Sequence, residues 1–221
     1  MQSNRLKEVP RSDPPILGKH QSGVRPIAKE LPEGYPGLAI RHTPLTHHER
    51  TQMYAMRFEV YCKMGSFLRE EYPDELEHDE YDQSAIHFIS TLHSHVVGTL
   101  RLIFEQRGRF LMEDGEEGFS LPGWIPRQAT CEISRIAAGR FLDPVERQRV
   151  RQFPLLAARA CQWSLDHGYR NWIAAFVEPA FHILTQDGWP MVLLGPARTY
   201  HRITAVPVAI NLEDLWYVLT H

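Results

Sequence analysis

The chain has 221 residues, of which 43% are hydrophobic and 23% charged, and its net charge is −3 with the histidines neutral. This composition fits one globular domain with a full core, and the charge balance argues against a dominant nucleic-acid surface. The three cysteines, Cys62, Cys131 and Cys161, form no C-x-x-C motif. We therefore expect neither a disulfide framework nor a zinc site, and a cytoplasmic location is the default.

Residues 1–36 differ from the rest of the chain. They carry six prolines, mixed charge and no lasting hydrophobic periodicity. We interpret them as a flexible N-terminal arm that precedes one domain at residues 37–221; an arm that covers a groove is the alternative. The first 20 residues lack the apolar segment of a signal peptide, and no stretch approaches the roughly 18 apolar residues that suggest a membrane span.

A strand followed by a helix opens the predicted domain. Residues 37–45 are typical of a short strand, and residues 46–65 predict a helix with apolar residues at helical spacing. Thr46 is a suitable N-cap with Glu49 three residues later, which is the capping-box pattern. Gly65 is suited to ending this helix.

An acidic loop and a hairpin come next. Residues 68–82 are acidic and contain a proline, so they are predicted to form a loop. Residues 85–91 and 95–104 alternate as two strands with a short turn between them. Residues 105–128 hold four glycines and two prolines, which indicates a long loop of the kind that is usually functional or disordered.

The remaining elements alternate between strands and helices. Residues 129–138 predict a strand, the strongly basic segment 143–153 follows, and residues 154–168 predict a helix with proline at its start and glycine after its end. Further strands are expected at 171–177, 191–195 and 204–211, and further helices at 179–188 and 212–221. This order indicates an α/β (α+β) protein with a mixed central sheet flanked by helices.

Three charged residues lie among apolar neighbours on predicted strands: Arg101, Glu132 and Arg135. Burying an unpaired charge is costly, so each should have a partner or line a cleft. Glu132 and Arg135 would face opposite sides of a regular strand, whereas a β-bulge would bring both to one face, as happens near active sites. The alternative is an internal ion-pair network that braces the sheet against the helix at 46–64.

The segment "LEHDEYDQSAIHFIST" (76–91) places four carboxylates directly before a strand: Glu77, Asp79, Glu80 and Asp82. A solvated acidic loop is one interpretation. The other is a site for a substrate amine, because an α-amine with a pKa near ~8 must lose a proton before it acts as a nucleophile.

Together these residues resemble the signature of the acyl-homoserine-lactone (autoinducer) synthases. The series comprises Arg57, Tyr61, Phe67, Glu77-x-Asp79-x-x-Asp82, Arg101 and Glu132-x-x-Arg135. The segments "RFEVYC", "LEHDEYDQSAIHF", "VVGTLRL", "EISRIA" and "LLGPARTYH" resemble still more closely the related N-acyl amino acid synthases, including those associated with exosortase systems. The resemblance covers roughly residues 40–205, and its motifs are specific only as a set.

The resemblance implies a GNAT-like N-acyltransferase fold that transfers a long-chain fatty acyl group from acyl carrier protein to the α-amine of an amino acid. It implies catalytic roles for Glu132, Asp79, Asp82 and Ser134, with Glu132 as the base. It implies that Arg57, Arg101 and Arg135 brace the acidic loop and bind the carboxylate of the substrate, since an arginine fork matches a carboxylate. The remaining substrate-binding residues that it implies are Tyr61, Phe67 and Glu77.

The resemblance also implies a cleft for the acyl thioester. The strand "EISRIA" would splay from "NWIAAFV", and a main-chain N–H there would stabilise the oxyanion. Candidates for lining the acyl tunnel are Phe104, Trp124, Phe176 and Leu194, for which ordinary core packing is the alternative. The segment 139–153 lacks the Gly-x-Gly that coenzyme A-dependent GNAT proteins use for the pyrophosphate, and it is basic. We expect acidic acyl carrier protein to bind there, at Arg140, Arg147, Arg149 and Arg151; a solvated basic turn is the alternative.

Other chemistries have little support in the sequence. His42, His47 and His48 lack the companions of a metal site, so neither a metal nor a cofactor is expected. Cys131 adjoins Glu132 but has no histidine at a recognisable distance, and it is interpreted as core. Two further hypotheses stay open: a synthase that uses S-adenosylmethionine as the amine, and a non-catalytic module that binds lipid or acyl carrier protein. A peripheral membrane contact through the lipid product is also open.

Overall fold

The computed structural model describes residues 37–138 and 152–221. The predicted arm at 1–36 and the basic patch at Arg140, Arg147, Arg149 and Arg151 lie outside the described residues. Eight strands form one sheet: β1 (Leu38–His42), β2 (Ile86–Leu92), β3 (His95–Ile103), β4 (Thr130–Ala138), β5 (Asn171–Val177), β6 (Met191–Leu193), β7 (Arg198–Tyr200) and β8 (Ile203–Asn211). The α-helices are α1 (His47–Met64), α3 (Gln152–Asp166), α4 (Glu178–Gln186) and α5 (Leu212–Thr220).

The sheet has the order β1-β2-β3-β4-β5-β8-β6, and β7 pairs with β8 outside this path. All neighbours are antiparallel except β4 and β5, which are parallel. The mixed sheet predicted from the sequence is confirmed. The short strand β7 was not expected, because three residues carry too little alternation to be recognised.

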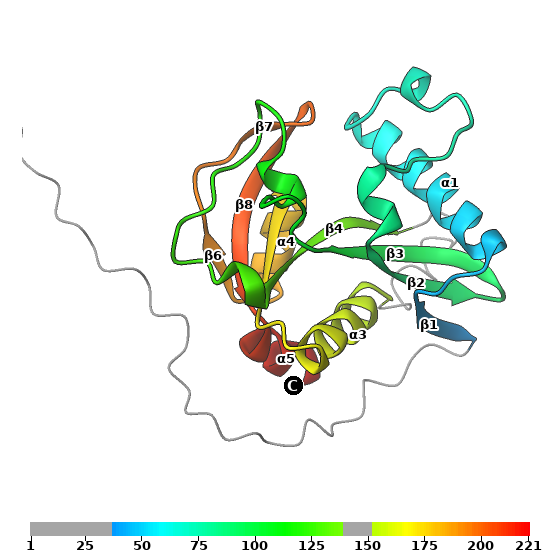
Figure 1. Ribbon diagram of the computed structural model, residues 1–221. Coiled ribbons are helices and arrows are strands. Elements are labelled where there is room, and N and C mark those ends of the chain that lie inside the picture. Colours follow the sequence, from blue (N-terminus) through cyan, green and yellow to red (C-terminus); the bar gives the residue numbers. More distant parts are fainter. Residues whose placement is uncertain (1–36, 139–151) are drawn as a thin grey trace, which may run out of the picture.

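Helices cover both faces of the sheet (Figure 1). Helix α1 packs against β3 and β4, whereas α3 packs against β1, β2 and β3 from the other face and contacts α5. The larger core lies under α3 and surrounds Trp172, which has no exposed surface. A smaller core lies under α1 and includes Met53 and Ile89.

Local sequence explains where α1 begins and ends. Thr46 accepts a hydrogen bond from the Glu49 N–H, and the Glu49 side chain accepts one from the Thr46 N–H, so the predicted capping box is present. At the other end Gly65 has φ +77°, and its N–H and that of Ser66 bond back to the carbonyls of Cys62 and Tyr61. A residue with a side chain would be strained at Gly65.

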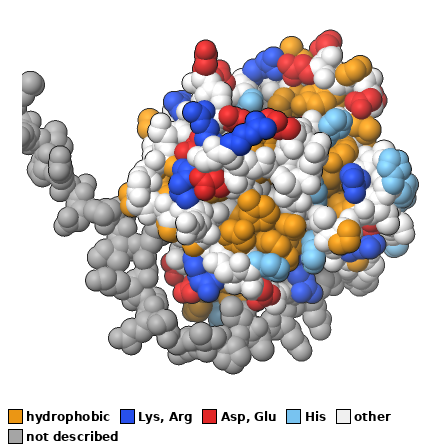
Figure 2. Space-filling model, viewed as in Figure 1, with side chains coloured by type: hydrophobic (Ala, Val, Ile, Leu, Met, Phe, Trp, Pro, Cys, Tyr) orange, Lys and Arg blue, Asp and Glu red, His pale blue; other side chains and the backbone are white. Residues whose placement is uncertain are grey.

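The surface seen in Figure 2 carries interspersed acidic and basic side chains, with apolar side chains gathered near the middle of this face. This face therefore presents no extended surface of one sign of the kind that nucleic-acid binding requires. None of the helices that the structure describes is long and apolar enough to cross a membrane.

Candidate active site

The acidic loop is held by buried arginines from the neighbouring elements. Arg57 of α1 donates from Nε to Glu77 at 2.5 Å, and from Nη1 and Nη2 to the two carboxylate oxygens of Asp82 at 2.8 and 3.1 Å. Arg101 of β3 donates from Nη1 and Nη2 to Asp79 at 2.6 and 3.0 Å, and from Nη1 to Asp82 at 2.8 Å. Both arginine side chains are 0% exposed.

Arg135 of β4 completes this network. Its Nε donates to Glu77 at 2.9 Å and its Nη2 donates to Asp79 at 2.8 Å. Three arginines and three carboxylates therefore balance one another in charge. The internal ion-pair network was one of the two interpretations of the strand charges. The structure confirms it for Arg101 and Arg135 but not for Glu132, which forms no ion pair with the described residues. The acidic loop is not simply solvated.

Burial and the neighbouring arginines together set the pKa values of the carboxylates in the network. Burial raises the pKa of Asp82, but Arg57 and Arg101 outweigh it and hold this pKa well below its ordinary value. The pKa of Asp79 is lowered in the same way by Arg101 and Arg135. His87 lies next to Asp82, yet burial lowers its pKa to about 4, so this imidazole is neutral at pH 7.

A β-bulge lies at Arg135. The register of β3 and β4 shifts between Thr99, which pairs with Ala137, and Arg101, which pairs with Ser134. Arg135 has φ +48°, the left-handed conformation found in such irregularities. A bulge that brings both charges to one face was the other interpretation of the sequence, and a bulge is present here: Glu132 and Arg135 line the same cavity.

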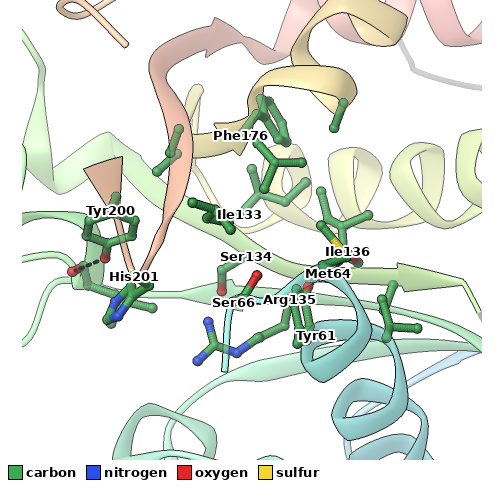
Figure 3. Close-up of a pocket in the computed structure, with 18 of the residues that line it drawn as sticks. Tyr61, Met64, Ser66, Ile133, Ser134, Arg135, Ile136, Phe176, Tyr200 and His201 are labelled. Atoms are coloured by element: carbon green, nitrogen blue, oxygen red, sulfur yellow. Dashed lines mark hydrogen bonds between the residues drawn. The ribbon is translucent and has the colours of Figure 1, made fainter. Parts of the chain in front are cut away.

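This cavity opens where β4 and β5 part. The two strands pair only at Thr130–Asn171, Cys131–Trp172 and Glu132–Ile173, and no pairing between them follows among the described residues. The cavity has a volume of about 420 Å³ and is lined mainly by apolar residues of α1, β4, β5 and α4. Figure 3 shows Ser66, Ser134 and Arg135 together at one end, with Tyr200 and His201 to one side and Phe176 opposite.

Glu132 is the one carboxylate among the described residues that lines this cavity. Its side chain is buried, and its Oε2 accepts a hydrogen bond from the Met112 N–H at 3.0 Å. Its Oε1 has no hydrogen-bond partner in the described part of the chain. Burial raises the pKa of Glu132 to about 7, against the influence of the Met112 N–H and of Arg101 and Arg135. Such a carboxyl group can accept and return a proton near neutral pH.

The loop at 105–128 supports Glu132 from the side. Arg127 donates to Glu105, Glu113 and the Gly108 carbonyl, which ties the loop to itself. Apolar side chains of the loop form a core together with residues of β5, β7 and β8, and in this core Phe110 and Met112 have no exposed surface. Because this core fixes Met112, its N–H points at Glu132.

The predicted site residues fall into two groups. Glu132, Ser134, Arg135, Tyr61 and Phe67 line the cavity. Those in the ion-pair network that do not line it are Arg57, Glu77, Asp79, Asp82 and Arg101. The fully buried Arg57 and Arg101 hold the acidic loop, and of the three arginines in the network Arg135 alone lines the cavity. The binding and catalytic roles of all ten residues stay predictions.

Of the four candidates for lining the acyl tunnel, one lines the cavity and three pack in the core. Phe176 lines the cavity, whereas Phe104 packs with Trp163 and Tyr169 in the core under α3. Trp124 and Leu194 pack against the core of the 105–128 loop. The core alternative therefore holds for these three residues. Sequence reasoning did not identify the lining residues Ser66, Tyr200 and His201, or the Met112 N–H.

Cys131 is core, as predicted. It has no exposed surface, and burial raises the pKa of its thiol to about 12, so it stays protonated. No group of three metal-ligating side chains suited to a metal ion occurs within 37–138 or 152–221.

Known proteins share this architecture. The GNAT acetyltransferase domain family matches residues 56–140. No curated protein matches the sequence. The solved structure of the acyl-homoserine-lactone synthase LasI superposes with a TM-score of 0.61 at 16% identity, over 83% of this chain and 93% of that one. BjaI is a coenzyme A-dependent acyl-homoserine-lactone synthase whose structure was solved with S-adenosylmethionine and isopentyl-CoA. It superposes with a TM-score of 0.65 at 17% identity, over 83% of this chain and 88% of that one.

A third structure belongs to the other predicted class. FeeM, an N-acyl amino acid synthase from uncultured soil microbes, gives a TM-score of 0.53 at 14% identity over 80% of this chain and 92% of that one. At these identities the likeness establishes the fold. The chain therefore has a GNAT-type fold, which the acyl-homoserine-lactone synthases and the N-acyl amino acid synthases share.

Proposed function

We propose that this protein transfers a long-chain fatty acyl group from acyl carrier protein to the α-amine of an amino acid and so produces an N-acyl amino acid. The observation that carries the proposal is Glu132, a buried carboxyl group with a pKa near 7 that lines a cavity at the splayed edges of β4 and β5. This position combines a base with unpaired main chain, which is the pair of functions that aminolysis of a thioester needs.

The reaction follows from these groups. The amine enters as an ammonium ion, and Glu132 Oε1 accepts its proton. The free amine attacks the thioester carbonyl carbon and forms the C–N bond, while a main-chain N–H of β4 beyond the last paired residue stabilises the oxyanion. The C–S bond then breaks, and the carrier thiolate leaves as a thiol with the proton that the amine nitrogen loses.

The apolar part of the cavity is suited to the acyl group. Ile133, Phe176, Leu184 and Ile183 line the cavity, and they offer the acyl chain an apolar surface. The predicted contact of acyl carrier protein with the basic segment 143–153 falls outside the described residues. It enters the proposal from the sequence alone.

The test is incubation of the purified protein with an acyl carrier protein loaded with a C16 acyl group, in the presence of each amino acid in turn. We expect mass spectrometry to detect an N-acyl amino acid, with release of the carrier thiol. Acyl-coenzyme A in place of the carrier protein is the second donor arm. Transfer from acyl-coenzyme A alone would overturn the choice of donor but not the acyltransferase activity.

A second candidate is an acyl-homoserine-lactone synthase that uses S-adenosylmethionine. The observation in its favour is that LasI and BjaI superpose with TM-scores of 0.61 and 0.65, against 0.53 for FeeM. S-adenosylmethionine also carries an α-amine and a carboxylate, so the same polar groups suit it. Product formation with S-adenosylmethionine alone would replace our proposal with this one. A binding module, the third hypothesis, would give no product with any amine.

A further inference from the structure

The hydroxyl of Ser66 is buried in the cavity without a partner. Ser66 is 3% exposed and lines the cavity, yet its Oγ makes no hydrogen bond to any residue that the structure describes. A buried hydroxyl that lacks a hydrogen bond costs free energy, so such atoms call for an explanation. A ligand that fills the cavity would supply the missing bond.

The end of α1 places this hydroxyl. Gly65 adopts the left-handed conformation, and the Ser66 N–H then donates to the Tyr61 carbonyl at 3.0 Å. The backbone of Ser66 is therefore fixed by the helix end, while its side chain remains unengaged. Figure 3 shows Ser66 beside Ser134 and Arg135 at the same end of the cavity.

Arg135 has one N–H group at this end of the cavity that is free to bind a ligand. Its Nε and Nη2 are engaged by Glu77 and Asp79, whereas its Nη1 has no hydrogen-bond partner among the described residues. The guanidinium group is held over two aromatic rings, 5.7 Å from the centre of Tyr61 and 5.2 Å from that of Phe67. Its position is thus set before a ligand binds.

We propose that Ser66 Oγ–H and Arg135 Nη1–H together bind the carboxylate that adjoins the reacting amine. The inference rests on the proposed function, which already names an amino acid as the acceptor, and it adds Ser66 as a residue that recognises the carboxylate of that acceptor. A hydroxyl and a guanidinium N–H offer two donors, which suit the two oxygens of a carboxylate. The ammonium end of the same zwitterion lies toward Glu132, which is the free carboxylate of the cavity.

The neighbouring charges agree with a zwitterionic ligand. The three arginines and three carboxylates of the network balance one another, so only Glu132 adds charge to the cavity. A ligand with one positive and one negative end leaves this balance intact. Ser66 is a specificity-determining residue in this account, because it contacts the part of the acceptor that does not react.

The test uses Ser66→Ala and two acceptors: the amino acid that the parent protein acylates fastest and the primary carboxamide of that amino acid. A hydrogen bond to a charged group contributes enough that its loss raises KM for the amino acid by roughly 10- to 100-fold, with kcat nearly unchanged. KM for the carboxamide should change by less than about threefold. Ser66→Thr keeps a hydroxyl and should restore most of the affinity for the amino acid.

Thr99→Val is the matched control. Thr99 Oγ1 is also buried and without a partner among the described residues, but Thr99 does not line the cavity. Its removal should leave both KM values unchanged. The melting temperature of each variant shows whether a kinetic change reflects loss of the fold.

Two results would overturn the inference while leaving the proposed function in place. One is an equal rise of KM for both acceptors in Ser66→Ala, and the other is no rise for either. If the parent protein acylates no amine, the proposed function fails and the inference is tested by binding. Calorimetry would then compare glycine with glycinamide in the parent and in Ser66→Ala, and equal affinities throughout would reject it.

Discussion

Replacing Glu132 by Gln should reduce acyl transfer and stabilise the fold at the same time. Gln keeps an oxygen to accept the Met112 N–H bond but cannot take a proton from the amine. Loss of a general base lowers kcat/KM by about 10²- to 10⁴-fold. The parent should gain activity as the pH rises through about 7, where Glu132 loses its proton, and the variant should lack this titration.

The stability change follows from the same pKa. The pKa of Glu132 rises from 4.5 to about 7 on folding, which at about 1.4 kcal/mol for each pKa unit corresponds to about 3 kcal/mol. Below pH 4.5 Glu132 is protonated in both states and imposes no cost. As the pH rises from 4.5 to about 7 the unfolded chain releases its proton first, so the parent loses this stability. Glu132→Gln should match the parent at pH 4 and exceed it by up to about 3 kcal/mol at pH 8.

The assays are thiol release from the acyl carrier protein and urea denaturation at the two pH values. Glu75→Gln is the control, because Glu75 pairs with Arg69 at the surface and does not line the cavity. It should change neither transfer nor the pH dependence. Transfer by Glu132→Gln within threefold of the parent would refute the assignment of the base. Equal stability of parent and variant at pH 8 would refute the electrostatic reasoning.

Three other substitutions test the ion-pair network, the cavity wall and the N-cap of α1. Arg57→Met should lower the free energy of unfolding by about 3–5 kcal/mol, because Glu77 and Asp82 each lose a buried arginine partner. Urea denaturation measures this change, and a loss below about 1 kcal/mol would contradict the importance of the ion-pair network. The same variant should flatten the loss of stability at acid pH, since the low pKa of Asp82 contributes stability above pH 4 that disappears as the pH falls. Ala175→Phe should narrow the cavity, so that the protein prefers shorter acyl donors, with an unchanged melting temperature. If the preference for acyl chain length stays the same, the acyl group binds elsewhere. Thr46→Ala should cost about 1 kcal/mol by removing the N-cap, and Thr46→Ser, which keeps the hydroxyl, should not.

Most of the fold was predictable, because its elements carry local signals. The capping box of α1, its terminal Gly65 and the alternation of the β2–β3 hairpin are each encoded in a few adjacent residues. The order of helices and strands then restricts the sheet to a mixed type. Strand β7 and the short 3₁₀ turn at Glu80–Gln83 were missed, because both are shorter than the window in which periodicity can be recognised.

The site was less predictable than the fold. Charged residues on apolar strands pointed to Arg101, Glu132 and Arg135, since their burial demanded partners. The sequence could not show that Asp82 faces Arg57, because that contact joins residues 25 positions apart. It also gave no sign of the Met112 N–H, which is a backbone group that any residue type would supply. Ser66 was missed for a related reason: its significance lies in the absence of a partner, which only three-dimensional coordinates reveal.

The end of pairing between β4 and β5 has a consequence for how the sequence of this protein can change. Glu132 is the last residue of β4 that pairs with its parallel neighbour, so the proposed proton acceptor and the proposed gap for the acyl donor occupy adjoining positions on one strand. Insertion or deletion of a single residue in β4 before this point would turn the carboxylate to the opposite face of the sheet. New acceptors and donors can therefore arise through substitutions in the cavity walls, whereas the length of this strand is fixed by the chemistry.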